Sequence, residues 1–174
     1  MTKKFRIGAA GVAMFAALGM GSAAQAQSAT ADANAEILEA LLLTNNSALD
    51  FGTLVVDGAG TVTIAAAPLA TAACAGDVIC SGTSTPANFT VDGSDGRVVE
   101  VNLPPVDGEL RHTGFAASAA PEHNIDLDDF TQSSGTVTLT GGTADFDIGG
   151  RLTLDGSEIE GAYTTTFEIT VNYQ

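Results

Sequence analysis

The stretch Gly161-Ala-Tyr-Thr-Thr-Thr-Phe-Glu-Ile-Thr-Val-Asn-Tyr-Gln174 decides the fold class. Its large side chains all occupy odd-numbered positions, with polar residues at the even ones: Tyr163, Phe167, Ile169, Val171 and Tyr173. An alternation with a period of two, rich in β-branched and aromatic residues, predicts one long β-strand with a single buried face. Gly161 precedes the alternation and predicts a bend or bulge. Such a strand either lies between earlier strands or leaves an edge that something else has to cover.

Further short strands are predicted upstream by alternating residues and by the turn residues between them. They are expected at 37–43, 49–56, 61–64, 87–91, 97–103, 125–130, 136–140, 144–148 and 151–154. Turns are expected at 44–47, 57–58, 92–96, 141–142, 149–150 and 155–156, where Gly, Asp, Asn and Ser concentrate. Residues 65–86 and 106–124 are expected to be irregular. This pattern predicts an all-β fold, a single Ig-like antiparallel β-sandwich with no helix beyond the N-terminal leader.

The first 26 residues have the three parts of a secretory signal peptide. Lys3, Lys4 and Arg6 form a basic region, an apolar run follows, and Ala24-Gln25-Ala26 is a cleavage motif. This predicts export to the periplasm, the cell surface or the medium, and no later stretch is apolar enough to span a bilayer. The expected organisation is a signal peptide at 1–26, an N-terminal extension at 27–37 and one β-sandwich domain at 38–174.

The mature chain is strongly acidic. It keeps all 21 acidic residues of the sequence but only three basic ones, Arg97, Arg111 and Arg151, which gives a net charge of −18. Because a negative surface repels phosphate backbones, nucleic acid is excluded as a partner. A basic patch for anionic lipid is excluded for the same reason.

The sequence has two cysteines, Cys74 and Cys80. In an oxidising compartment two such residues are expected to pair, which predicts a small disulfide loop. A metal site or a redox pair is the alternative. The spacing C-x5-C differs from C-x-x-C, however, and no second pair of ligands accompanies it.

The segment after the cleavage motif alternates as strictly as the C-terminal one, but with small side chains. The odd positions are Ala29, Ala31, Ala33, Ala35 and Ile37, and the even positions are polar. Alanine side chains bury too little surface to hold a strand by themselves, so the segment is expected to be mobile unless it docks on a sheet edge. The alternatives are a low-complexity tail, or a strand that pairs within its own domain.

Both ends of the mature chain carry a resemblance to known proteins. A glycine fourteenth from the end, alternating apolar residues and a penultimate tyrosine resemble the C-terminal signature of bacterial chaperone–usher pilus subunits. Together with Leu49-Asp-Phe-Gly-Thr-Leu-Val55, this ending is similar to the proteobacterial family called domain of unknown function 4402, DUF4402. The resemblance implies a pilin-like sandwich without catalytic residues. It also implies that residues 28–37 act as a donor strand and that a groove beside Gly161–Tyr173 accepts a strand.

The partners implied are copies of the chain itself or related subunits, together with a periplasmic chaperone and an outer-membrane usher. The residues add no enzymatic alternative of comparable weight. His112 and His123 lie in a predicted loop without a nucleophile motif, and Asp92–Gly96 lacks the distal glutamate of a calcium loop. Carboxylate pairs such as Asp128-Asp129 or Glu158 with Glu160 are expected by chance in so acidic a chain. The sequence therefore predicts no enzyme and no cofactor. A self-sufficient secreted module that binds a surface protein or carbohydrate remains the alternative to a structural subunit.

Overall fold

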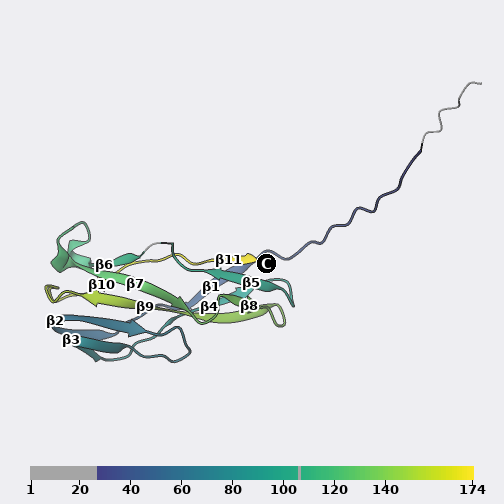
Figure 1. Cartoon of the computed structure of the whole chain (residues 1–174). Helices are drawn as coiled ribbons and strands as arrows, with labels where there is room; N and C mark the ends of the chain where they lie inside the picture. Colours follow the sequence, from purple (N-terminus) through teal and green to yellow (C-terminus); the bar gives the residue numbers. More distant parts are fainter. Residues whose placement is uncertain (1–26, 106) are drawn as a thin grey trace, which may run out of the picture. The chain divides into compact units, whose positions relative to one another are not determined.

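The computed structural model describes residues 27–105 and 107–174, and these form an all-β structure (Figure 1). The strands are β1 (Leu42–Ser47), β2 (Thr53–Ile64), β3 (Ala73–Ser81), β4 (Ala87–Asp92), β5 (Val98–Asn102), β6 (Gly108–His112), β7 (Asn124–Gln132), β8 (Thr136–Thr138), β9 (Thr143–Leu154), β10 (Tyr163–Thr164) and β11 (Thr170–Tyr173). Two single 3-10 turns, η1 (Thr113–Phe115) and η2 (Pro121–His123), follow β6. Among these residues there is no helix that is long and apolar enough to cross a membrane. The predicted signal peptide lies outside the described residues.

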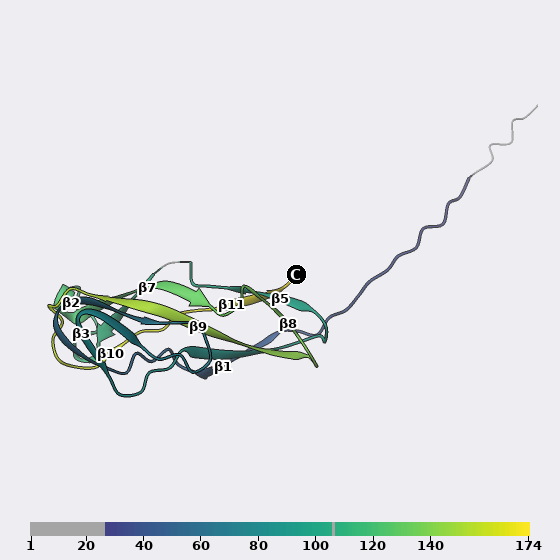
Figure 2. The same cartoon turned by 60° about the horizontal axis from the view of Figure 1, so that its bottom comes forward.

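The strands form two antiparallel sheets, so the predicted all-β sandwich is confirmed. The larger sheet has the order β1-β4-β9-β7-β6-β10, with β2 and then β3 added beside the second half of β9. The smaller sheet has the order β11-β5-β8. Strand β9 is central, because residues 143–148 pair with β4, residues 150–154 pair with β2, and β7 lies along its other edge. Figures 1 and 2 both show β5, β8 and β11 toward one end of the sandwich and β2, β3 and β10 toward the other.

Two apolar clusters hold these layers together. The first lies between the small sheet and β4–β9, and its fully buried members include Val91, Val99, Leu139, Phe146 and Ile148. The second joins β2, β3, β7 and the end of β9 through Val62, Ile64, Leu127 and Leu152. Each such side chain contributes roughly 1.5–3 kcal/mol by leaving water. The small sheet therefore packs over only one half of the larger one.

The pair Gly149-Gly150 was predicted to be a turn, and this prediction is wrong. Both glycines lie inside β9, which runs without interruption from Thr143 to Leu154. A Cβ atom on Gly149 would lie 2.1 Å from the carbonyl oxygen of Ile64. The glycine is there because the end of β2 approaches the backbone of β9 too closely for any side chain.

The segment 65–86 was predicted to be irregular, yet β3 pairs with β2 along most of its length. The predicted disulfide between Cys74 and Cys80 is confirmed, and both cysteines lie within β3. Their Cα atoms are 5.7 Å apart, whereas six residues of straight strand span about 20 Å. Strand β3 therefore folds back on itself near Gly76, where β2 shifts register between Val56 and Gly60. The predicted turn at 57–58 lies in that shift, inside β2.

Three further predictions from turn chemistry are corrected. Residues 44–47 belong to β1 because Asn46 lies on an exposed strand face, where its amide donates to the side chains of Asn88 (2.8 Å) and Thr90 (2.7 Å) on β4. Strand β6 lies within the predicted loop 106–124. Residues 92–96 do turn the chain, but they were expected to close a hairpin between paired strands. They instead connect β4 of the larger sheet to β5 of the smaller one. The exposed face of a strand accommodates the same polar residues and glycines as a turn. Composition alone therefore predicted turns in these segments.

Candidate functional site: the outer edge of the terminal segment

The terminal segment, residues 161–174, is divided between the two sheets. Its first part, β10, pairs with β6 in the larger sheet, and its last part, β11, pairs with β5 in the smaller one. Residues 165–169 between them belong to no strand. The prediction of one long strand is therefore wrong, because the segment passes from one sheet to the other halfway along.

The division follows from unequal lengths in the two paired segments. Thr164 pairs with Arg111 and Thr170 with Asn102. Five residues therefore lie between the pairs on the terminal segment and eight on its partner. The partner segment also contains Pro104-Pro105, whose nitrogens carry no hydrogen and cannot donate to a strand ladder. The two segments separate here and rejoin beyond the gap.

Apart from Thr165, which is exposed, the alternation of burial continues through the gap. Ile169 is buried, and Tyr163, Phe167, Val171 and Tyr173 are half-buried. Every even-numbered residue from 164 to 172 is exposed. The prediction of a single buried face for the terminal segment is thus confirmed, whereas the role of these residues as a strand acceptor is not tested by their burial.

The outer edge of this segment is open within the described part of the chain. Strand β10 is the last strand of the larger sheet and β11 is the last strand of the smaller one. Residues 165–169 form no backbone hydrogen bond with any described residue. Along residues 163–173, the backbone N–H and C=O groups that point away from β6 and β5 therefore have no neighbouring strand. An edge of this kind is a template for another strand.

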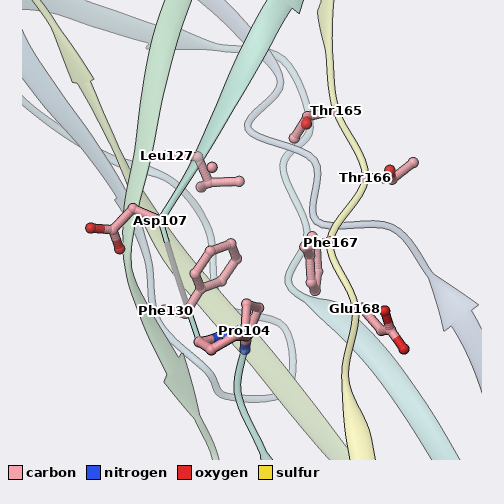
Figure 3. Close-up of a pocket in the computed structure, with 10 residues that line it drawn as sticks. Pro104, Asp107, Leu127, Phe130, Thr165, Thr166, Phe167 and Glu168 are labelled. Carbon is pink, nitrogen blue, oxygen red and sulfur yellow. The ribbon is translucent and has the colours of Figure 1, made fainter.

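A cavity of about 220 Å³ lies where the terminal segment and its partner separate (Figure 3). Its described lining includes Pro104, Leu127, Phe130, Thr165 and Phe167. The rings of Phe130 and Phe167 are 5.1 Å apart between centroids, and Figure 3 shows them on opposite sides of the space. A cavity of roughly 150 Å³ is enough for benzene, so this one has room for an apolar side chain.

At one end of the segment, the hydroxyl of Tyr173 binds the start of the domain. It donates to the carbonyl oxygen of Glu39 (2.9 Å) and accepts from the backbone N–H of Ser94 (2.7 Å). The N–H of Glu39 in turn donates to the hydroxyl of Ser94 (2.8 Å). The chain therefore enters its domain beside its own penultimate tyrosine. The alternation in the sequence predicts only that Tyr173 lies on the buried face. No local pattern reveals a contact between residues so far apart in the chain.

At the other end, Tyr163 belongs to an aromatic cluster with both histidines. Its hydroxyl donates toward the carbonyl oxygens of Ile159 (2.8 Å) and Glu122 (2.9 Å), and burial raises the pKa of Tyr163. His112 packs edge-on against Tyr163, with 5.1 Å between ring centroids, and its Nδ1 accepts from the N–H of Gly114. The ring of His123 stacks on that of Phe115 at 4.1 Å. The histidines thus lie among packed rings at this end of the sandwich.

The carboxylate pairs singled out from the sequence make local structural contacts. Asp128 and Asp129 both bind Arg151, and the hydrogen bond that Arg151 donates to Asp128, at 2.8 Å, is the main reason that the pKa of Arg151 is raised. Glu158 accepts from the backbone N–H groups of the turn at Asp155 and Gly156. Within residues 27–105 and 107–174, no group of three His, Cys, Asp or Glu side chains is placed to hold a metal ion.

The N-terminal extension is described by itself, since the chain divides into two compact units after Glu36. Residues 27–36 are exposed at every position and belong to no helix or strand. Ile37, the first residue of the second unit, is 94% exposed. The predicted donor residues are therefore outside both sheets, and their role as a donor strand stays a prediction.

Comparison with known proteins gives one match. The model of a family described as "Domain of unknown function (DUF4402)" matches residues 41–173. No curated protein and no solved structure matches the chain.

Proposed function

Since the chain belongs to the DUF4402 family, we propose from its open strand edge that it is an exported structural subunit of a pilus or other cell-surface assembly. Residues 28–37 of one copy pair with the outer edge of residues 163–173 in the next copy. A periplasmic chaperone covers the same edge before assembly, and an outer-membrane usher receives the subunit. The proposal includes no enzymatic activity and no cofactor.

The observation that carries the proposal is the open edge of the terminal segment. Within the described residues, neither β10 nor β11 has a neighbour on its outer side, and residues 165–169 have no backbone partner. An isolated protein with so long an exposed edge risks uncontrolled association. A subunit whose edge is covered by a specific strand from another copy avoids that risk and gains ladder hydrogen bonds of about 1 kcal/mol each.

The N-terminal extension has the properties of a strand that completes another sheet. Its alternation matches the period of a strand, and its exposed residues belong to neither sheet of the domain. Main-chain bonds supply the affinity in such an addition, whereas small side chains fix the register. A slip of one residue turns every inward side chain to solvent, so the alternation opposes it.

Export fits the same picture. The leader at 1–26 has the sequence of a signal peptide. The Cys74–Cys80 disulfide closes a fold in β3, and such bonds persist in oxidising compartments such as the periplasm or the cell surface. We therefore place the assembly outside the cytoplasm.

The test is polymer formation by the mature chain with and without residues 28–36. Deleting these residues removes the donor and leaves the domain that begins at Ile37 intact. We expect the deleted chain to keep its circular dichroism spectrum and melting transition while electron microscopy shows no filaments. Normal filaments from the deleted chain would contradict the proposal.

A matched pair of substitutions separates register from charge. Ala33→Asp places a charge on the inward face of the donor, whereas Thr30→Asp places the same charge on the outward face. We expect Ala33→Asp to abolish filaments and Thr30→Asp to retain them. If the mature wild-type chain is instead a stable, protease-resistant monomer at all concentrations, the alternative of a self-sufficient secreted binding module is favoured.

A further inference from the structure

The donor and acceptor segments are complementary in size at every inward position, but only in one alignment. The inward residues of the extension are four alanines and then Ile37. Within residues 165–173 of the open edge, the odd-numbered residues are Thr165, which is exposed and lines the cavity, and then Phe167, Ile169, Val171 and Tyr173. Each set has one exceptional member: Ile37 is the large residue among small ones, and Thr165 is the small residue among large ones.

Pairing the two exceptional residues aligns both segments completely. When Ile37 lies opposite Thr165 in an antiparallel pair, Ala35 lies opposite Phe167 and Ala29 opposite Tyr173. A small side chain then faces a large one at all five inward positions, which is the arrangement that fills a layer without voids or clashes. Ile37 then also lies opposite Thr165, one of the residues that line the cavity between the terminal segment and its partner.

The charges on the outward face select the same alignment. The open edge has one charged residue, Glu168, which is exposed. In the alignment above, Glu168 lies opposite Asn34. Sliding the extension by two residues in either direction keeps the inward face inward but brings Asp32 or Glu36 opposite Glu168. Like charges directly opposite each other destabilise a strand pair.

The direction follows from the same pairing and from the start of the domain. In a parallel pair, placing Ile37 opposite Thr165 would carry the rest of the extension beside residues 156–164, away from the open edge. A parallel strand along the edge would bring its residues 37–39 to the Tyr173 end, where the acceptor's own Glu39 already receives the Tyr173 hydroxyl bond. Only an antiparallel strand ends there with its small N-terminal residues.

We propose that the extension of one copy lies antiparallel on the open edge of the next copy with Ile37 opposite Thr165 and Asn34 opposite Glu168. This inference rests on the proposed function and specifies its partner, direction and register. The donor's own domain, which begins at Ile37, then lies beyond the Tyr163 end of the acceptor. Phe115 and Ile159, which are 47% and 36% exposed, lie at that end. Since the two contacting ends differ, the contact is heterologous, and it builds an open filament when the rotation from one subunit to the next does not close a ring.

Disulfide trapping in the mature chain tests this register. Glu168→Cys is combined in one chain with Asn34→Cys, with Asp32→Cys or with Glu36→Cys, so that the three variants report three alignments. The only cysteines of the natural sequence, Cys74 and Cys80, are already bonded to each other. A fourth variant, Thr30→Cys with Asn172→Cys, reports the antiparallel direction. Cysteines directly opposite on neighbouring strands lie within the Cα distance that a disulfide allows.

After mild oxidation, we expect non-reducing gels to show a ladder of covalent multimers for the 34/168 and 30/172 variants, at least tenfold stronger than for 32/168 and 36/168. A ladder that is strongest for 32/168 or 36/168 would overturn the register and leave the proposed function standing. A ladder for 34/168 without one for 30/172 would overturn the direction. An intrachain disulfide in a monomer would overturn both the inference and the proposed function. Filaments without any cross-link would show that the edge is covered by something other than the extension.

Discussion

Replacing Tyr173 by phenylalanine removes the hydroxyl that joins the C-terminal strand to the start of the domain. The hydroxyl donates to the carbonyl oxygen of Glu39 and accepts from the N–H of Ser94, at 2.9 and 2.7 Å. The ring itself is half-buried on the inward face of β11 and is kept by the substitution. The change therefore deletes two hydrogen bonds and little apolar contact.

The expected loss of stability is about 2 kcal/mol. A net hydrogen bond contributes roughly 0.5–1.5 kcal/mol, and the two backbone groups left behind are near enough to the surface for water to replace part of what is lost. For a domain of this size, about 2 kcal/mol lowers the melting temperature by roughly 4–8 °C. The bond between the N–H of Glu39 and the hydroxyl of Ser94 remains and keeps the entry of the chain near its place.

The assay combines thermal unfolding with amide hydrogen exchange, and Tyr163→Phe is the matched control. That substitution also removes a tyrosine hydroxyl, which binds two carbonyl oxygens at the opposite end of the terminal segment. We expect Tyr173→Phe to accelerate exchange at the Ser94 amide and Tyr163→Phe to leave it unchanged. Unaltered exchange at Ser94 in Tyr173→Phe, together with an unchanged melting temperature, would refute the contact and its assigned energy.

Three further predictions concern the fold. Gly149→Ala forces a Cβ atom to within 2.1 Å of the Ile64 carbonyl oxygen, so urea unfolding is expected to show that the free energy of unfolding falls by about 3 kcal/mol or more. The control is Gly108→Ala, whose Cβ atom would lie 4.0 Å from its nearest neighbour, and which is expected to change stability by less than about 1 kcal/mol. Replacing both Cys74 and Cys80 by serine opens a loop of seven residues and is expected to cost about 2 kcal/mol in the same assay. Because burial raises the pKa of Tyr163 above its ordinary value of 10.0, its contribution is complete below pH 10 and is lost as the pH rises further. Tyr163→Phe is therefore expected to flatten the fall of urea stability as the pH rises above 10, and an unchanged profile would contradict this cause.

The face of the terminal segment was predictable from its sequence, but its partners were not. Alternation is a local property, so the odd-numbered side chains are correctly placed on the inward face. The passage from one sheet to the other depends on the extra residues between Asn102 and Arg111, and nothing in the terminal segment itself reports them. The open edge, which makes this segment a candidate site, is visible only once both pairings are known.

Glycine had two meanings that a single sequence does not separate. Gly141-Gly142 forms the predicted turn, with φ of 69° and 86°. Gly149-Gly150 has the same letters but lies in a strand, where contact with the backbone of Ile64 and Ala65 excludes a side chain at Gly149. The disulfide was predictable from the cysteine count and the expected compartment, whereas its position inside a folded strand depends on pairing with β2, a long-range contact.

The two prolines at 104 and 105 have a lasting consequence for the gap between the terminal segment and its partner segment. A nitrogen without hydrogen cannot become a donor under any condition of salt or pH. Pro104 and Pro105 therefore cannot donate ladder hydrogen bonds to residues 165–169. The lack of these two donors is thus a covalent property of the chain, and no change of conformation can restore them. The gap that contains the cavity is therefore a permanent feature of the folded chain and does not depend on solution conditions.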